Sequence, residues 1–328
     1  MDNVQSAARR LCIGTSAFFL ASLALPALAD GYPARPIRLI VPLTAGSAAD
    51  VLARQLGAKM TENWGQQVVT DNRPGAGGTI GTAIVARAPA DGYTLLVHSA
   101  AFAVSAAFYS KLPYDAVKDF APVSQIAIAP IVLVVAPSLN VKSVKSLLAL
   151  AKQKSGQLTF ASSGVGTSTH FAAEQFKVAT GINAIHVPYK GPPEALLDVA
   201  TARVSYFLAP LVPALPFIKD GRLLALGVTT AARSAVLPDI PTIAEAGVSN
   251  YEYQDWWGLF APARTPHAVI DKLSKEIARV VALTEVVGYL HSQGAEAHAS
   301  SPEVFSRFVR AKVENTIHVV RLAGIRPE

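Results

Sequence analysis

Four short stretches concentrate the residues of this chain that are suited to binding a small anion, and each follows an apolar run. The first precedes a helical pattern and consists of small or apolar residues, namely Leu43, Thr44, Ala45, Gly46 and Ser47. Small residues at the start of a helix leave backbone N–H groups accessible, which is the geometry of many anion sites. The same spacing fits ordinary capping, with Ser47 as the N-cap and Asp50 three residues later. Both interpretations stay open.

The second stretch is the glycine-rich run 72–81, and its candidate binding residues are Gly77, Gly78 and Thr79. A dinucleotide fingerprint is not favoured, because Ile80 stands where the third glycine of G-x-G-x-x-G belongs. Pro74 interrupts the turn from strand to helix, and the next strand ends in His98 rather than in a carboxylate that binds ribose. The run therefore predicts a second amide-rich helix start. Ser99, directly after His98, joins the candidates.

The third stretch, 161–170, is dense in hydroxyl groups and flexible backbone, and its candidates are Ser162, Ser163, Gly164, Thr167 and Thr169. Hydroxyl and N–H donors of this kind can surround a carboxylate. A serine hydrolase is the alternative interpretation, with Ser163 as nucleophile and His170 as base. The stretch lacks the G-x-S-x-G elbow, and His170 falls on the first turn of the expected helix, which favours a structural role.

The fourth site is a pair of segments, each expected to follow a strand. One is 188–192, where Tyr189 either closes over a ligand or packs as a half-buried aromatic ring. The other is Ala209 with Pro210. If both strands belong to one parallel sheet, these segments lie at its carboxyl edge, where ligands bind in open α/β sheets.

The remaining composition excludes several classes of function. The seven histidines show neither H-x-x-H nor H-E-x-x-H spacing, and the single cysteine, Cys12, cannot form a disulfide or a CxxC motif within the chain, so no metal and no cofactor are expected. The net charge of +6 is dispersed, with no basic stripe among aromatic residues, so nucleic-acid binding is not expected. Among the carboxylates only Asp255 is suggestive, beside the tryptophans 256 and 257, which favour a core or hinge.

The positioning elements alternate between strand and helix. Strands are predicted at 37–41, 67–70, 93–97, 131–135, 158–160, 184–187, 204–208 and 223–228, and helices at 47–63, 79–88, 143–154, 169–180, 193–200 and 214–219. This order predicts parallel sheets in two α/β units, near 35–125 and 131–228, followed by a helical tail. Two such units joined by extended segments would enclose a cleft.

The N-terminus predicts a secretory signal over residues 1–29. Arg9 and Arg10 precede an apolar run, and Ala27-Leu28-Ala29 is an A-x-A cleavage site, so cleavage is expected after about Ala29. A membrane anchor is the alternative, weakened by Pro26. The mature chain would then contain no cysteine, be periplasmic and have no stable membrane insertion.

At these loops the chain resembles the Bug-type extracytoplasmic solute receptors, the binding proteins of tripartite tricarboxylate transporters. The resemblance covers nearly the whole mature chain. Its most specific motifs are Asn-Arg-Pro-Gly-Ala-Gly-Gly at 72–78 and Pro-Asp-Ile-Pro-Thr at 238–242, with Asp-Gly-Tyr-Thr-Leu-Leu at 91–96 and Trp-Gly-Leu-Phe-Ala-Pro at 257–262. The first loop departs from the family pattern Phe-Pro-Ala-Gly-Gly, since Leu43 and Thr44 replace Phe-Pro and Ser47 replaces the second glycine.

The resemblance implies a two-lobed α/β fold, the type II or Venus-flytrap periplasmic binding protein, with no catalytic residues. One lobe would combine 30–130 with 252–328, and the other would be 131–251. It further implies capture of a small carboxylate, such as a di- or tricarboxylate, an acidic amino acid or an aromatic acid, for a membrane permease. A periplasmic sensor for a signalling partner is an alternative with the same fold, and the serine hydrolase is a more distant one.

Overall fold

The computed structural model describes residues 31–322 and residue 325. The predicted signal 1–29, with Cys12 and its cleavage site, lies outside the described residues. Within the described residues, the chain from Pro33 onward forms one compact unit. None of the helices in the described part of the chain combines the length and the apolar composition needed to cross a membrane.

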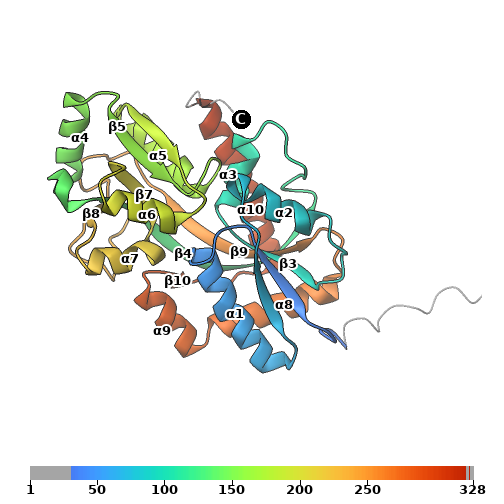
Figure 1. The fold of residues 1–328 in the computed structure, drawn as a ribbon. Helices are drawn as coiled ribbons and strands as arrows, with labels where there is room; N and C mark the ends of the chain where they lie inside the picture. The colour runs from blue at the N-terminus through green and yellow to red at the C-terminus, as the bar shows by residue number, and fades with distance from the viewer. Residues whose placement is uncertain (1–30, 323–324, 326–328) are drawn as a thin grey trace, which may run out of the picture. The chain divides into compact units, whose positions relative to one another are not determined.

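Ten strands within the described residues form one curled sheet (Figure 1). They are β1 (Ile37–Val41), β2 (Val68–Asn72), β3 (Thr94–Ser99), β4 (Phe120–Val135), β5 (Leu158–Ser162), β6 (Ala184–Pro188), β7 (Tyr206–Pro210), β8 (Leu224–Val228), β9 (Gln254–Pro262) and β10 (Glu296–Ala297). The main path is β2-β1-β3-β9-β4-β7-β5-β6, while β8 and β10 pair with β4. The pairs β1–β2, β1–β3, β5–β6 and β5–β7 are parallel, as predicted.

The long strand β4 connects the two halves of this sheet. Its first part, Phe120–Pro130, pairs with β9, and its last part, Ile131–Val135, pairs with β7 and β8. Strand β9 pairs on its other side with β3. The first half therefore consists of β2, β1, β3, β9 and β10 with the start of β4, and the second half of β5 to β8 with the end of β4.

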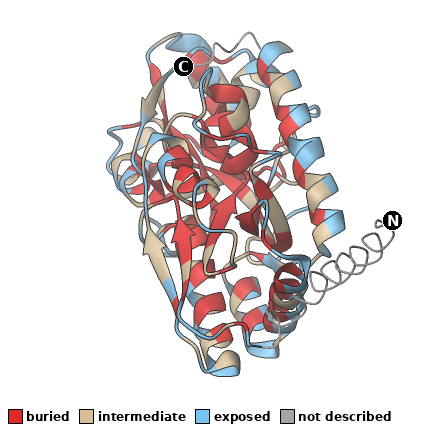
Figure 2. Cartoon of the chain, turned by 90° about the vertical axis from the view of Figure 1, so that its right-hand side faces the viewer, coloured by how far each residue is buried: buried red, intermediate tan, exposed pale blue. Residues whose placement is uncertain are grey.

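Helices follow most strands and cover the sheet (Figures 1 and 2). They are α1 (Ala48–Trp64), α2 (Thr79–Ala86), α3 (Ala101–Phe108), α4 (Val144–Gln153), α5 (Ser168–Thr180), α6 (Pro192–Ala200), α7 (Leu211–Lys219), α8 (His267–Val281), α9 (Thr284–Ser292) and α10 (Pro302–Leu322), with short 3₁₀ turns η1 (Ala76–Gly78) and η2 (Pro137–Leu139). Helix α10 packs on α3 and β4, and α8 packs on α1 and β4. The C-terminal segment thus completes the first half.

Separate apolar cores support the two halves. In the first half, stacked and edge-on rings join Phe102, Phe120, Trp256, Phe260 and Phe305. The second half has one core on each side of its strands: one surrounds Phe160, Phe176 and Tyr206, and the other surrounds Phe207. A small cluster of α3, α5 and α10 residues, including Phe108 and Phe171, lies between the halves. Both tryptophans 256 and 257 are buried, as predicted.

The structure differs from the sequence prediction in strand orientation and in several elements. The predicted parallel arrangement does not extend to β4, which pairs antiparallel with β7, β8, β9 and β10. The tail is not wholly helical, because Gln254–Pro262 form β9, a strand buried along all but its first residue, so it shows no alternation of apolar and polar residues. Helix α3 was not predicted, because it is buried on nearly all sides and lacks an amphipathic stripe. The predicted strand 131–135 is only the end of β4.

Packing of β9 against α10 leads to a stability prediction. A methyl group at Gly258 would lie 2.1 Å from the Cζ atom of Phe305, whose side chain is fully buried. Because overpacking of a rigid core typically costs about 1–3 kcal/mol, Gly258→Ala should lower the free energy of urea-induced unfolding by at least that amount. Gly288→Ala is the matched control, since nothing lies within 4 Å and alanine favours its helix by up to about 1 kcal/mol. Equal stability of Gly258→Ala and the unaltered chain would contradict this packing.

Candidate functional site

The first predicted loop lies between β1 and α1 and is capped as expected. The Ser47 hydroxyl accepts the Asp50 N–H at 3.4 Å, and the Asp50 carboxylate accepts the Gly46 N–H at 2.9 Å. Burial would raise the pKa of Asp50, but hydrogen bonds from Arg54 and from Gly46 hold it below its usual value. One amide of the loop is thus already bound to a carboxylate, while the first-turn N–H groups of Ala48 and Ala49 lack intrahelical acceptors.

The glycine-rich second loop contacts the third loop across the two halves. A methyl group at Gly77 would lie 2.3 Å from the carbonyl oxygen of Val165, and that same oxygen accepts a hydrogen bond from the Tyr109 hydroxyl at 3.1 Å. Gly77 and Gly78 both have positive φ angles, 62° and 97°, which glycine adopts without strain. Thr79 then begins α2. These glycines therefore allow both the turn and the close approach.

The third loop forms its own hydrogen-bond network. The Thr169 hydroxyl accepts the Ser163 N–H at 2.9 Å, the Ser162 hydroxyl accepts the Gly164 N–H at 3.1 Å, and the Thr167 hydroxyl donates to the Gly164 carbonyl at 2.6 Å. Ser162 is the last residue of β5 rather than a loop residue. The network fixes the loop in front of α5, so the predicted hydroxyl groups are held in place by one another.

The fourth segments differ in part from prediction. Ala209 and Pro210 do not follow a strand but are the buried end of β7, directly before α7. The Tyr189 hydroxyl donates to the Asp198 carboxylate at 2.7 Å, which anchors this ring on α6. Beyond it, Gly191 lies so near the first loop that a methyl group there would be 1.9 Å from the Thr44 hydroxyl oxygen.

Taken together, these contacts bring the predicted loops of both halves to one place. Thr44 meets Gly191, Gly46 lies beside Pro193, and Gly77 meets Val165. Helices α1, α3, α5 and α7 begin directly or shortly after the carboxyl ends of β1, β3, β5 and β7, and α2 and α6 follow β2 and β6. Because N-terminal helix ends carry a partial positive charge, this edge favours an anion. Loops of the two halves are thus in direct contact at this edge.

Sequence reasoning missed His98 as a member of this region. Its Nδ1 accepts the Ser99 N–H at 2.9 Å, so the neutral ring carries its proton on Nε2, and that buried nitrogen has no hydrogen-bond partner. It lies against Gly78, where a methyl group would come within 2.8 Å. Complete burial lowers the pKa of His98 to about 3. The buried Thr44 hydroxyl oxygen is likewise unpartnered. The signal available in the sequence for His98 was a polar residue at the end of an apolar strand.

Ser163 and His170, the alternative catalytic pair, have other hydrogen-bond partners in the structure. The Ser163 hydroxyl accepts from Thr169 at 3.2 Å, whereas His170 accepts the Gly166 N–H through Nδ1 at 3.3 Å. The serine and histidine within hydrogen-bond distance are Ser162 and His186, at 2.6 Å, and Ser162 is fully buried. Within the part of the chain that the structure describes, no group of three or more His, Cys, Asp or Glu residues is placed to hold a metal ion.

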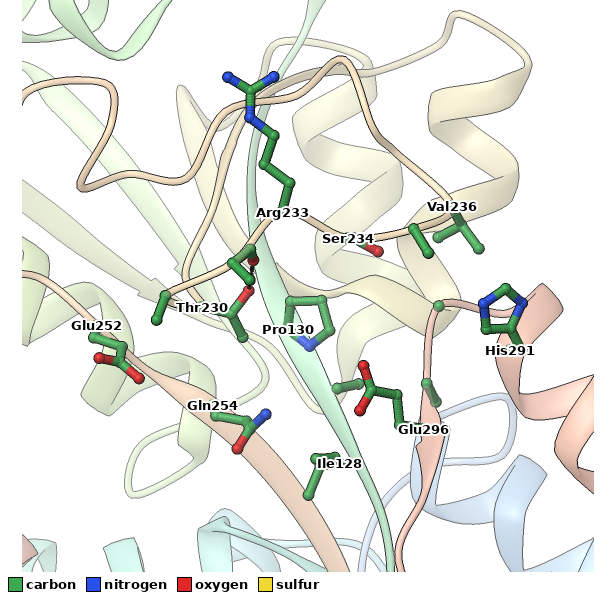
Figure 3. Close-up of a pocket in the computed structure, with 16 residues that line it drawn as sticks. Ile128, Pro130, Thr230, Arg233, Ser234, Val236, Glu252, Gln254, His291 and Glu296 are labelled. Carbon is green, nitrogen blue, oxygen red and sulfur yellow. Dashed lines mark hydrogen bonds between the residues drawn. The ribbon is translucent and has the colours of Figure 1, made fainter.

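A separate cavity lies beside β4 and the start of β9 (Figure 3). It has a volume of about 270 Å³ and is lined by β4 around Pro130, by the loop 230–236, by Glu252 and Gln254, and by His291 and Glu296. Side chains alternate between the two faces of a strand, so Gln254 and its neighbour Asp255 point to opposite sides of β9. None of the predicted ligand residues lines this cavity.

The fold and these contacts between its halves define a two-lobed periplasmic binding protein of type II. The family model for the tripartite tricarboxylate transporter family receptor matches residues 52–325, and the chain belongs to that family. It is 35% identical over 308 residues to the protein BugT of Bordetella pertussis, covering 93% of this chain and 94% of BugT. The resemblance found in the sequence motifs is thereby confirmed.

Solved structures agree with this assignment. A protein of R. palustris solved with adipate is 37% identical, with a TM-score of 0.88 over 90% of this chain and all of that one. MatC of Rhodopseudomonas palustris, solved with bound malate, is 28% identical, with a TM-score of 0.84 over 88% of this chain and all of MatC. The fold is therefore shared along the whole length of these two proteins.

Two buried histidines, His98 and His170, and the half-buried His186 predict how stability depends on pH. Burial lowers the pKa of His98 and His170 to about 3 and that of His186 to about 4, and His186 and Lys177 lower the His170 value further. Below pH 6.5 the unfolded chain binds protons on these rings that the folded chain does not, so stability falls as the pH drops toward 4. Each such proton lowers the unfolding free energy by about 1.4 kcal/mol per pH unit.

Asp255 acts in the opposite direction and offsets the effect of about one of the three histidines. Burial raises its pKa to about 7, so the folded chain binds a proton there at a higher pH than the unfolded chain does. Urea unfolding of the unaltered chain at pH 7 and pH 5 should therefore show a clear loss of stability at pH 5. The double variant His170→Gln with His186→Gln should flatten that loss, whereas the exposed His267→Gln should not. An unchanged slope in the double variant would show that these rings are not buried in neutral form.

Proposed function

We propose that the protein is a periplasmic receptor that binds a small carboxylate between two lobes and delivers it to a membrane permease. The observation that carries the proposal is the convergence of strand–helix loops from both halves at one place. We propose lobes of 30–130 with 252–328 and of 131–251, so that the chain crosses between them within β4 and again just before β9. Export to the periplasm by the 1–29 signal is part of the same proposal.

Neutral donors would hold the ligand. The loops 43–47, 75–79, 162–169 and 209–210 contain no lysine or arginine, and the single cation of segment 188–192, Lys190, is exposed. Helix N-termini, the N–H on Nε2 of His98 and the Thr44 hydroxyl would supply hydrogen bonds to an anion instead. The adipate and malate of the two solved relatives support a dicarboxylate as the ligand class. Delivery to a permease rests on the family's name as a transporter receptor.

Ligand binding is tested first by thermal unfolding. Adipate, malate, glutamate and benzoate form the panel, and adipamide is the uncharged match for adipate. A ligand at about 100 times its dissociation constant should stabilise the folded chain by about 2.7 kcal/mol and raise the melting temperature by several degrees. Stabilisation by adipamide equal to that by adipate, or by no acid in the panel, would contradict the proposed anion cleft.

Closure is tested at Gly191. Its φ of −176° is extended backbone that any residue adopts, and the atoms nearest to a methyl group there belong to Thr44. Gly191→Ala should leave the ligand-free melting temperature within about 1 °C and weaken binding of the best acid in the panel. Overpacking costs of about 1–3 kcal/mol correspond to roughly 5- to 150-fold.

Thr44→Ala combined with Gly191→Ala should restore part of that affinity, because the hydroxyl oxygen 1.9 Å from the new methyl group is removed. Titration calorimetry measures both effects, with Gly288→Ala as the control glycine. Binding by Gly191→Ala as tight as that of the unaltered chain would mean that loops one and four do not meet in the liganded form.

A further inference from the structure

The carboxylate of Asp255 joins both halves at the base of the cleft. It lies on β9 and is 1% exposed. Its Oδ1 accepts the N–H of Ala100 at 3.3 Å and that of Trp256 at 3.0 Å, and its Oδ2 accepts the Ser168 hydroxyl at 3.1 Å. Ala100 belongs to the first half and Ser168 to the second. One buried side chain thus connects the two halves through its two oxygens.

The two partners of Asp255 stand at the starts of two helices. Ala100 is the N-cap of α3 and supplies no side-chain cap, and Ser168 is the first residue of α5. A carboxylate at a helix N-terminus satisfies N–H groups and is favoured by the helix dipole. Asp255 therefore caps α3 from a distant strand and holds the start of α5 beside it. The start of α3 thus already has an internal anion.

The surroundings of Asp255 provide no cation. Helix α3 and strand β4 contain no charged residue, and Asp255 is the sole charged residue of β9. On α5, Glu174 and Lys177 lie farther along the helix and pair with each other at 3.0 Å. Nearby titratable groups are His170 on the first turn of α5 and His98 on β3, both neutral because burial lowers their pKa values. The buried hydroxyl of Tyr253 has a pKa that burial and Asp255 raise.

Burial without a cation disfavours the ionised carboxylate. It raises the pKa of Asp255 to about 7, although the hydrogen bonds from Ser168, Trp256 and Ala100 act in the opposite direction. If the halves separate, Ser168 leaves with α5 and water reaches the carboxylate. Solvation then returns its pKa toward the ordinary value for aspartate. The closed cleft consequently binds a proton more tightly than an open one.

We propose that Asp255 is a proton-binding site coupled to closure, so that the cleft takes up one proton from solvent as it closes and returns it as it opens. This inference rests on the closure in the proposed function. A carboxylate ligand and a proton would enter the closed form together, and both would leave on opening. At pH values between the pKa of Asp255 in the open form and its pKa in the closed form, the equilibrium constant for closing should rise up to tenfold for each unit by which the pH falls.

Distance measurement across the cleft tests the coupling without needing a ligand. Spin labels are attached at Ile80→Cys on α2 and Leu197→Cys on α6, two exposed positions on opposite halves, in the full chain carrying Cys12→Ala. Pulsed electron resonance at pH 8 and pH 5.5 gives the populations of short and long distances. The ratio of short to long distances should rise at pH 5.5, but by less than Asp255 alone would give, because His170 packs on Phe108 of the other half and would gain a proton on opening.

Asp255→Asn is the decisive variant, because an amide keeps the acceptor for Ala100 and Trp256 and can donate to Ser168, but does not titrate. It should lose the rise in short distances at pH 5.5, whereas the exposed carboxylate variant Asp239→Asn should respond as the unaltered chain does. Ser168→Ala, which keeps the carboxylate, should shift the populations toward long distances and still respond to pH.

A rise in short distances at pH 5.5 that persists in Asp255→Asn, or that is missing from the unaltered chain, would overturn the proton coupling. Melting curves of Asp255→Asn verify that it folds, and if it does not, Ser168→Ala and the unaltered chain carry the test. The same labels separate the two proposals. If adipate and malate shorten the distance but pH does not, only the coupling fails. If no acid of the panel changes the distance at either pH, the proposed closure itself fails.

Discussion

The pairing of β4 with β9 is the constraint on which the rest of the structure depends. Residues 120–130 of β4 lie antiparallel to 254–262 of β9, and β4 then continues into the second half of the sheet. Because the chain crosses between the halves here, the loops after β1, β2 and β3 face those after β5, β6 and β7. The C-terminal helices α8 and α10 return to the first half as a direct consequence of β9 entering its sheet.

Electrostatics at the cleft come from the backbone rather than from cationic side chains. The loops present helix N-termini and hydroxyl groups, and two of the nearby carboxylates, Asp50 and Asp255, bind such donors within the protein. Internal anions of this kind keep the loops ordered and limit how many helix ends remain for a ligand. An anion held in this way depends on geometry, since no single charged residue fixes its position.

Much of this arrangement follows from the sequence. Alternating strands and helices predicted the parallel pairs, and small residues after the strands predicted the loops that meet. Strand β9 and helix α3 were not predictable in the same way, because burial on all sides removes the periodic pattern on which such predictions rest. The contributions of His98 and Asp255 depend on partners far apart in the chain, including the 155 residues between Ala100 and Asp255, which no local pattern encodes.

Gly191 shows that a residue can be constrained by a motion rather than by the fold. Its backbone conformation suits any amino acid, and its missing side chain matters only when Thr44 arrives from the other half. Laboratory selection for expression or heat resistance would therefore accept larger residues at this position. Selection for growth on the transported solute would reject them, so the two kinds of mutational map should disagree at residue 191 and agree at Gly258.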